Sequence, residues 1–170
     1  MGSTLDCRPF RLYSEAMRIA IGADHAGVTL KDELVLLLEA RGLAYTDFGT
    51  HGPESVDYPD IAADVSRAVA SGTYDRGVLV CGSGIGMAIA ANKIAGIRAA
   101  SVTDLEAARL SRSHNDANVL TLGARLTPLA LAQQIVTTFL ETPFEGGRHE
   151  RRVNKLTQLD GAAPKRNHLD

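Results

Sequence analysis

Short apolar segments alternate with helix-length segments along the chain, and this alternation constrains the fold more than any other feature. The pattern predicts strands at 18–24, 44–49, 77–81, 97–102 and 118–124. Helices are expected at 28–41, after Pro59, at 85–95, at 103–113, after Thr127-Pro128 and, strongly basic, at 146–156. Strands and helices in this order form a parallel sheet with helices on both faces and right-handed crossovers. The prediction is an α/β protein: a single Rossmann-like three-layer α/β/α domain with a five-stranded parallel sheet and a C-terminal basic helix.

Local signals predict where two helices end and where a third begins. Gly42 is placed to end the first helix, and Gly96 the third. The segment TDLE (103–106) reads as a capping box, in which Thr103 caps the helix and Glu106 reaches back to it.

Length and composition indicate one globular domain. The 170 residues are 45% hydrophobic and 22% charged, and a formal net charge of −2 argues against nucleic acid or an anionic membrane as the main partner. The expected division is an extension at 1–16, a domain at 17–157 and a polar tail at 158–170. Cys7 and Cys81 do not suggest a disulfide framework, and the leader lacks the apolar region of a signal peptide, so a cytoplasmic protein is expected.

A glycine-rich turn follows the most apolar strand, in VLVCGSGIGMAIAANK (78–93). Its glycines let the backbone approach a ligand, and the N–H groups at the following helix start favour an anion. The same N–H groups favour the thiolate form of Cys81, which would make it a base or nucleophile. The alternatives are a turn that needs glycine only for packing and, for the thiol, an ordinary buried cysteine.

A dinucleotide site is the sharper rival for this turn. The pattern G-x-G-x-x-G would require glycine at position 87, which is Met87. Asp104 stands where the acidic residue of that fingerprint is expected, but the helix start already gives it a structural role. The sequence therefore disfavours NAD.

Two histidine clusters and a basic helix add candidates. Asp24 and His25 follow the first strand, and His114 lies beside Asn115 before the fifth. Neighbouring Asp or Asn can fix a histidine tautomer, whereas no spacing typical of a metal site appears. In the last helix, Arg148 and Arg152 share a face and suit phosphate, although a solvated basic helix end would look the same.

Together these segments closely resemble one family. IGADHAG, DYPD, VCGSGIGMAIAANKIAGIRAA, SRSHNDANVLTLGAR and FEGGRHERRV are similar to the family of ribose-5-phosphate isomerase B, the galactose-6-phosphate isomerase subunits and allose-6-phosphate isomerase. The resemblance covers about Met17 to Leu156. It implies an aldose–ketose isomerase that converts a sugar phosphate through an enediol(ate), with no metal and no organic cofactor. Ribose 5-phosphate is the expected substrate. A six-carbon sugar phosphate and a non-catalytic phosphometabolite- or nucleotide-binding domain are the alternatives.

The resemblance also implies catalytic roles. Cys81 would move a proton between C2 and C1 of the sugar, while Ser83 and the turn N–H groups hold the enediolate oxygens. His114 would open the furanose ring with help from Asp24. One branch of the family uses a Glu four residues after the serine as its base, and Met87 stands there, which indicates the cysteine-base branch.

Substrate contacts are implied at nine further positions. Those to the sugar would come from Tyr58, Asn115 and the backbone of Gly82, Gly84 and Gly86, and those to the phosphate from His25, Arg125, Arg148 and Arg152.

The positions of two catalytic residues predict a shared site. Cys81 ends a strand and His114 precedes one, so in a single parallel sheet they should lie at opposite edges, about 17–20 Å apart. We therefore expect a homodimer in which His114 of one subunit serves Cys81 of the other; the alternative is a tetramer of two such dimers. No nucleic acid or membrane partner is expected.

Overall fold

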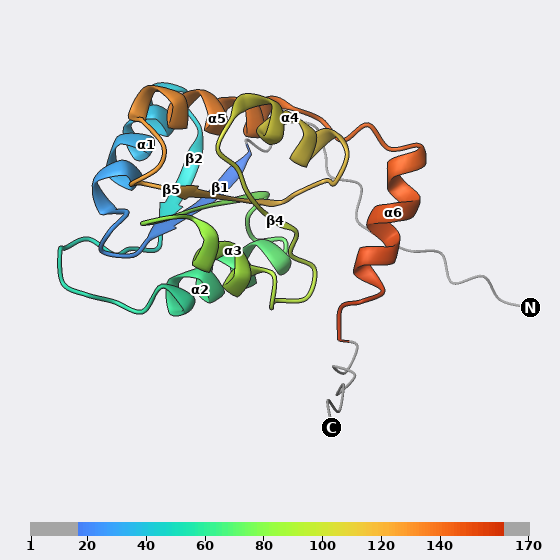
Figure 1. Cartoon of the computed structure of the whole chain (residues 1–170), viewed down its shortest axis with the longest axis horizontal. Coiled ribbons are helices and arrows are strands. Elements are labelled where there is room, and N and C mark those ends of the chain that lie inside the picture. The colour runs from blue at the N-terminus through green and yellow to red at the C-terminus, as the bar shows by residue number, and fades with distance from the viewer. Residues whose placement is uncertain (1–16, 162–170) are drawn as a thin grey trace, which may run out of the picture.

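The computed structural model describes residues 17–161, which form one α/β domain and a projecting helix (Figure 1). The expected extension 1–16 lies outside the described residues, as do residues 162–170 of the expected tail. The strands are β1 (Arg18–Ala23), β2 (Ala44–Asp47), β3 (Arg76–Cys81), β4 (Ala99–Ser101) and β5 (Val119–Gly123). The helices are α1 (Val28–Ala40), α2 (Tyr58–Ala70), α3 (Ile85–Ala91), α4 (Leu105–Ser113), α5 (Leu129–Glu141) and α6 (Arg148–Thr157).

All five strands are parallel, in the order β2-β1-β3-β5-β4. The central strands are continuous apolar runs because both of their faces are covered. Helices α1, α4 and α5 cover one face and α2 and α3 the other, as Figure 1 shows above and below the sheet. The predicted fold class is confirmed, and no helix among residues 17–161 is long and apolar enough to cross a bilayer.

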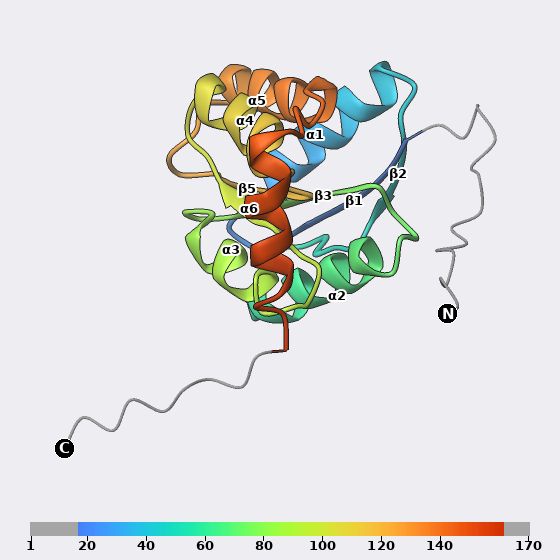
Figure 2. The same cartoon turned by 90° about the vertical axis from the view of Figure 1, so that its right-hand side faces the viewer.

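Helix α6 stands outside this three-layer body. In Figure 2 it runs across the edge of the sheet on the side of β4 and β5. Only His149 and Val153 of its residues are buried, and they lie four positions apart on one face. The helix is therefore held by a narrow contact and presents most of its basic surface outward.

Three local expectations were wrong. Helix α3 ends at Ala91 instead of 95, because the Asn92 side chain turns to the backbone of Ala99, donating to its carbonyl and accepting from its N–H. Strand β4 is only Ala99–Ser101. The cap of α4 is Asp104, whose Oδ1 accepts from the Ala107 N–H, while Glu106 pairs with Arg109 instead of reaching back.

Candidate active site

The predicted site lies at the point in the sheet where the chain connections reverse direction. The chain leaves β1 for β2 on one side of the sheet and leaves β3 for β4 on the other side, so the connections diverge between β1 and β3. Ligands of open α/β sheets bind at this point, beyond the carboxyl ends of the strands. Cys81 is the last residue of β3, and Asp24 directly follows β1, with its N–H donating to the Val80 carbonyl at 3.1 Å.

A hollow of about 420 Å³ opens at this point. The residues that line it are Asp24, His25, Ala26, Tyr58, Cys81, Gly82, Ser83, Gly86, Arg125 and Leu126. Eight of these are among the predicted site residues, and Gly84, a ninth, is buried within the same glycine turn. The structure thus brings together side chains from three strand ends and the start of α2.

The glycine turn wraps around the Cys81 thiol. Cys81 is 5% exposed, and the N–H of Gly84 donates to its Sγ at 3.1 Å. Gly84 has a φ of 79°, and a Cβ there would lie 2.9 Å from the carbonyl carbon of Leu122, so only glycine fits. The Oγ of Ser83 accepts from the Ile85 N–H at 3.3 Å and is exposed at the hollow. A thiol with an N–H donor and an adjacent hydroxyl can exchange a proton with a bound molecule.

Two side chains lie over the turn because glycines leave room for them. A Cβ on Gly82 would lie 3.2 Å from the Arg125 guanidinium, and a Cβ on Gly86 would lie 2.8 Å from the Tyr58 ring. Arg125 thus brings a permanent positive charge to the hollow, and Tyr58 brings a hydroxyl.

Asp24 and His25 sit at the opposite wall. The buried Asp24 carboxylate accepts from the N–H groups of Ala26 and Gly27, at 3.0 and 3.1 Å, and so fixes the chain entering α1. His25 is exposed, and its Nδ1 accepts from the Val56 N–H at 3.4 Å. The Arg125 guanidinium and the His25 ring make the hollow suitable for a small polar anion.

The loop after β2 is anchored by a pair that the sequence analysis missed. Lys31 is fully buried, and its ammonium donates to Asp47 Oδ2 at 2.5 Å. The other Asp47 oxygen accepts from the Gly49 N–H, and Gly49 in turn accepts from the Ala23 N–H at the end of β1. A lysine within an amphipathic pattern gives no sign that its charge is buried.

Four predicted residues lie away from the hollow: His114, Asn115, Arg148 and Arg152. Cys81 pairs with Gly123 at the end of β5, whereas His114 precedes the start of that strand. The five residues of β5 span about 16 Å. Within one chain the two groups therefore lie at opposite ends of the sheet. The two arginines are exposed on α6.

The turn that carries His114 and Asn115 is tied down by buried Arg112. Its Nη1 donates to Asp116 Oδ1 at 2.8 Å and to the Ala117 carbonyl, and its Nε donates to the Thr142 carbonyl. These bonds join the end of α4 to β5 and to the end of α5. The backbone that carries His114 is therefore held in place by these hydrogen bonds.

The neighbours of His114 were not predicted from the sequence. Its ring stacks on that of His149, with centroids 4.1 Å apart and planes 9° from parallel, and Glu145 Oε2 lies 3.8 Å from His114 Nε2. Burial lowers the pKa of His149, and the charges of His114 and Arg148 lower it further. The burial of His149 could have been inferred from the sequence, because it lies four positions before apolar Val153 and so on the same face of the helix.

These three residues also form a group that could in principle hold a metal ion. Within residues 17–161, the ligand atoms of His114, Glu145 and His149 lie within 4.8 Å of one another. The two imidazole planes are nearly parallel, however, so their in-plane lone pairs do not converge on one point unless a ring turns. Stacking describes this arrangement better than chelation.

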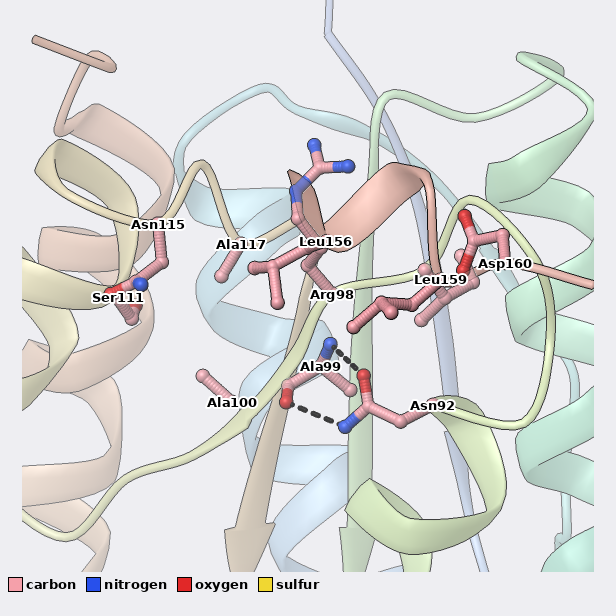
Figure 3. A pocket seen from close by; sticks show the side chains of 11 residues that line it. Asn92, Arg98, Ala99, Ala100, Ser111, Asn115, Ala117, Leu156, Leu159 and Asp160 are labelled. Atoms are coloured by element: carbon pink, nitrogen blue, oxygen red, sulfur yellow. Dashed lines mark hydrogen bonds between the residues drawn. The ribbon is translucent and has the colours of Figure 1, made fainter. Parts of the chain in front are cut away.

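A second hollow, of about 360 Å³, lies between the end of α6 and strand β4 (Figure 3). Asn92 forms its paired hydrogen bonds with Ala99 at its floor, and Leu156 and Leu159 project into it. Asn115 lines this hollow instead of the one around Cys81. Its walls are mostly apolar, so its chemistry fits packing better than catalysis.

Comparison with known proteins agrees with this geometry. A family model described as Ribose/Galactose Isomerase matches residues 19–156. Ribose-5-phosphate isomerase B of Escherichia coli K12 is 48% identical over 143 residues, which cover 84% of this chain and 96% of that protein.

Two solved structures are similar over most of their length. Ribose-5-phosphate isomerase B of Clostridium thermocellum has 54% identity and a TM-score of 0.83, covering 84% of this chain and 97% of the other. The Mycoplasma genitalium enzyme, solved with bound ribulose-5-phosphate, has 38% identity and a TM-score of 0.83, covering 86% and 98%.

Proposed function

The chain belongs to the ribose/galactose isomerase family, and on this premise we propose that it interconverts D-ribose 5-phosphate and D-ribulose 5-phosphate in the cytoplasm. The observation that carries the proposal is the Cys81 thiol at the base of the hollow, with the Gly84 N–H 3.1 Å from its sulfur. The bound ribulose-5-phosphate of the Mycoplasma genitalium relative supports the choice of substrate.

The chemical step is a proton transfer at adjacent carbons. Cys81, as thiolate, removes the proton from C2 of the open-chain aldose, and the electron pair forms the C1–C2 double bond of an enediolate. The hydroxyl proton passes from O2 to O1 of this intermediate, and return of the carbon-bound proton from Cys81 to C1 then gives the ketose, so atoms and charge balance without an oxidant. Ser83 and the N–H groups of the turn stabilise the oxyanion. A positioned base typically contributes about 10²–10⁴-fold, and one oxyanion donor about 10²–10³-fold.

Cysteine as the base defines a branch of the family. The position of the alternative glutamate is held by Met87, which is fully buried in the same apolar cluster as Cys81. A thioether cannot accept this proton, whereas the Cys81 thiol accepts a hydrogen bond from the Gly84 N–H of the turn. These features support assignment to the cysteine-base branch.

The phosphate is the natural ligand for the cationic groups. His25 and Arg125 line the hollow, and Arg148 and Arg152 are exposed on α6. A guanidinium binds phosphate oxygens through paired N–H groups, which favours arginine at such positions. Tyr58, Asn115 and the backbone of Gly82, Gly84 and Gly86 would contact the sugar hydroxyls.

Ring opening requires a partner subunit. His114, which would act with Asp24 on the furanose, lies about one strand length from Cys81 of its own chain, so it would serve the Cys81 of a second copy. The surface beside the glycine turn is suited to such a contact, because Ile85 and Ile89 of α3 are 57% and 58% exposed. Exposed apolar side chains that lie on one helix face favour burial against a protein partner. We place the active site at the interface of a homodimer.

A coupled assay for ribulose 5-phosphate formation tests the function. We expect kcat/KM for ribose 5-phosphate to exceed that for allose 6-phosphate and galactose 6-phosphate. Preference for a six-carbon sugar would replace the substrate but keep the chemistry. Calorimetric binding of ribose 5-phosphate, NAD or ATP without any turnover would instead identify a phosphometabolite- or nucleotide-binding domain and overturn the proposal.

A further inference from the structure

The ring of His114 rests on one face of His149. The centroids are 4.1 Å apart and the planes differ by 9°, which is a stacked pair. His114 is about one-third exposed, whereas His149 is buried. Within residues 17–161 the His114 ring makes no hydrogen bond, and Glu145 Oε2 at 3.8 Å is beyond that range. The broad face of His149 is therefore the main contact that sets the plane of the His114 ring.

His149 is itself firmly held. It lies in the first turn of α6, where its N–H donates to the Gly146 carbonyl at 3.0 Å, and it is buried on the same face of the helix as Val153. Arg148 Nε donates to His149 Nε2 at 3.3 Å, which requires a lone pair on that nitrogen and hence a neutral ring. A neutral ring can stack on His114 in either protonation state without charge repulsion.

We propose that His149 is a positioning residue that holds the His114 imidazole in the plane needed for ring opening in the partner's site. The proposal rests on the proposed function and deepens it, because it assigns a role to a residue outside both the hollow and the phosphate contacts. Within the cluster of His114, Glu145 and His149, the role of His149 is then to orient the His114 ring and not to bind a metal ion.

The stack also connects two parts of the proposed site. Arg148, a proposed phosphate ligand, contacts His149, and His149 contacts His114. The phosphate end of the substrate and the ring-opening group therefore meet through one buried imidazole. A shift of α6 would move both together.

Three variants separate positioning from general packing. His149→Ala removes the stacked face, whereas His149→Phe restores a flat ring of similar size without its nitrogens. Val153→Ala trims the other buried residue of α6 and serves as the matched control, because it loosens the same helix without touching either imidazole.

Steady-state assays with ribose 5-phosphate give the first result. Stacked aromatic pairs contribute enough free energy to correspond to about a two- to tenfold effect. We expect His149→Ala to lower kcat by that factor with little change in KM, and His149→Phe to recover most of it. The control should leave kcat near the wild-type value. Equal kcat for His149→Ala and wild type, or the same loss in Val153→Ala, would overturn the proposal.

A double-mutant cycle and NMR give independent results. In a His114→Asn background, His149→Ala should have no further effect on the residual rate, whereas a purely structural role would lower it again. The Cε1 proton of His114 should shift when the stacked ring is removed and return towards its original position in His149→Phe. The spectra need no turnover, so they test the stack even if wild type fails to isomerise ribose 5-phosphate, a failure that would count against the proposed function alone.

Discussion

The sulfur of Cys81 accepts a hydrogen bond from the backbone N–H of Gly84, at 3.1 Å, inside a turn that closes over it. The donor is part of the main chain and is fixed by the left-handed conformation of Gly84. The hydrogen-bond donor to the sulfur is therefore fixed by the backbone before any substrate binds.

Replacing this sulfur should separate catalysis from binding. We expect Cys81→Ser to lower kcat by about 10²–10⁴-fold, because a hydroxyl is a far weaker base than a thiolate near neutral pH. The affinity for ribose 5-phosphate, measured by calorimetry, should change little. Cys7→Ser is the matched control and should keep full activity. Parallel loss of binding and turnover would mean that Cys81 is structural.

Subunit mixing tests the divided site. Cys81→Ala and His114→Ala should each be inactive alone. After unfolding and refolding together, heterodimers should recover activity at one of their two sites, because one site then has both residues intact. Mass spectrometry of the mixture verifies exchange, and exchange without recovered activity would show that the two residues do not meet across subunits.

Gly84 should tolerate no side chain. Gly84→Ala combines a φ of 79° with a Cβ 2.9 Å from Leu122, whereas Gly72 has a φ of 75° and open space around its Cβ. Gly72→Ala should therefore cost only the backbone strain, about 1–2 kcal/mol of unfolding free energy. Chemical denaturation should give a larger loss for Gly84→Ala, together with loss of activity. Equal losses would contradict the close approach.

Lys31 should matter for stability, although it does not line the hollow around Cys81. Lys31→Met removes the buried ammonium from Asp47, whose carboxylate is 22% exposed and keeps the Gly49 N–H, so we expect a loss of about 1–3 kcal/mol of unfolding free energy. The exposed Lys93→Met is the control and should be near neutral. Urea denaturation measures both. A neutral Lys31→Met would show that the pair contributes nothing net.

Acid should destabilise wild type partly through His149. Its pKa is lowered in the folded state, mainly by burial, so the unfolded chain binds more protons below its ordinary value of about 6.5. Stability therefore falls as pH decreases through that value. His149→Phe lacks this contribution, and its unfolding free energy should decline less between neutral and mildly acidic pH. Parallel curves would contradict the shift.

The strands of the sheet were predictable because each is marked by its own short stretch of sequence. Buried parallel strands such as β3 are continuous apolar runs, and the glycine turn after Cys81 marks a strand end in the sequence itself. The early end of α3 was not predictable, because Asn92 finds its partner at Ala99 only after β4 is in place. Likewise, no short window of sequence brings His149 to His114, since that contact depends on where α6 docks. Lys31 was missed for the same reason.

The separation of Cys81 and His114 by the length of β5 has a consequence for dilute solutions. Under the proposed shared site, a single chain carries both Cys81 and His114 but holds them too far apart to act on one sugar. Specific activity should therefore fall when the enzyme is diluted enough for the subunits to dissociate. Small molecules that bind between the subunits should inhibit catalysis without occupying the sugar pocket.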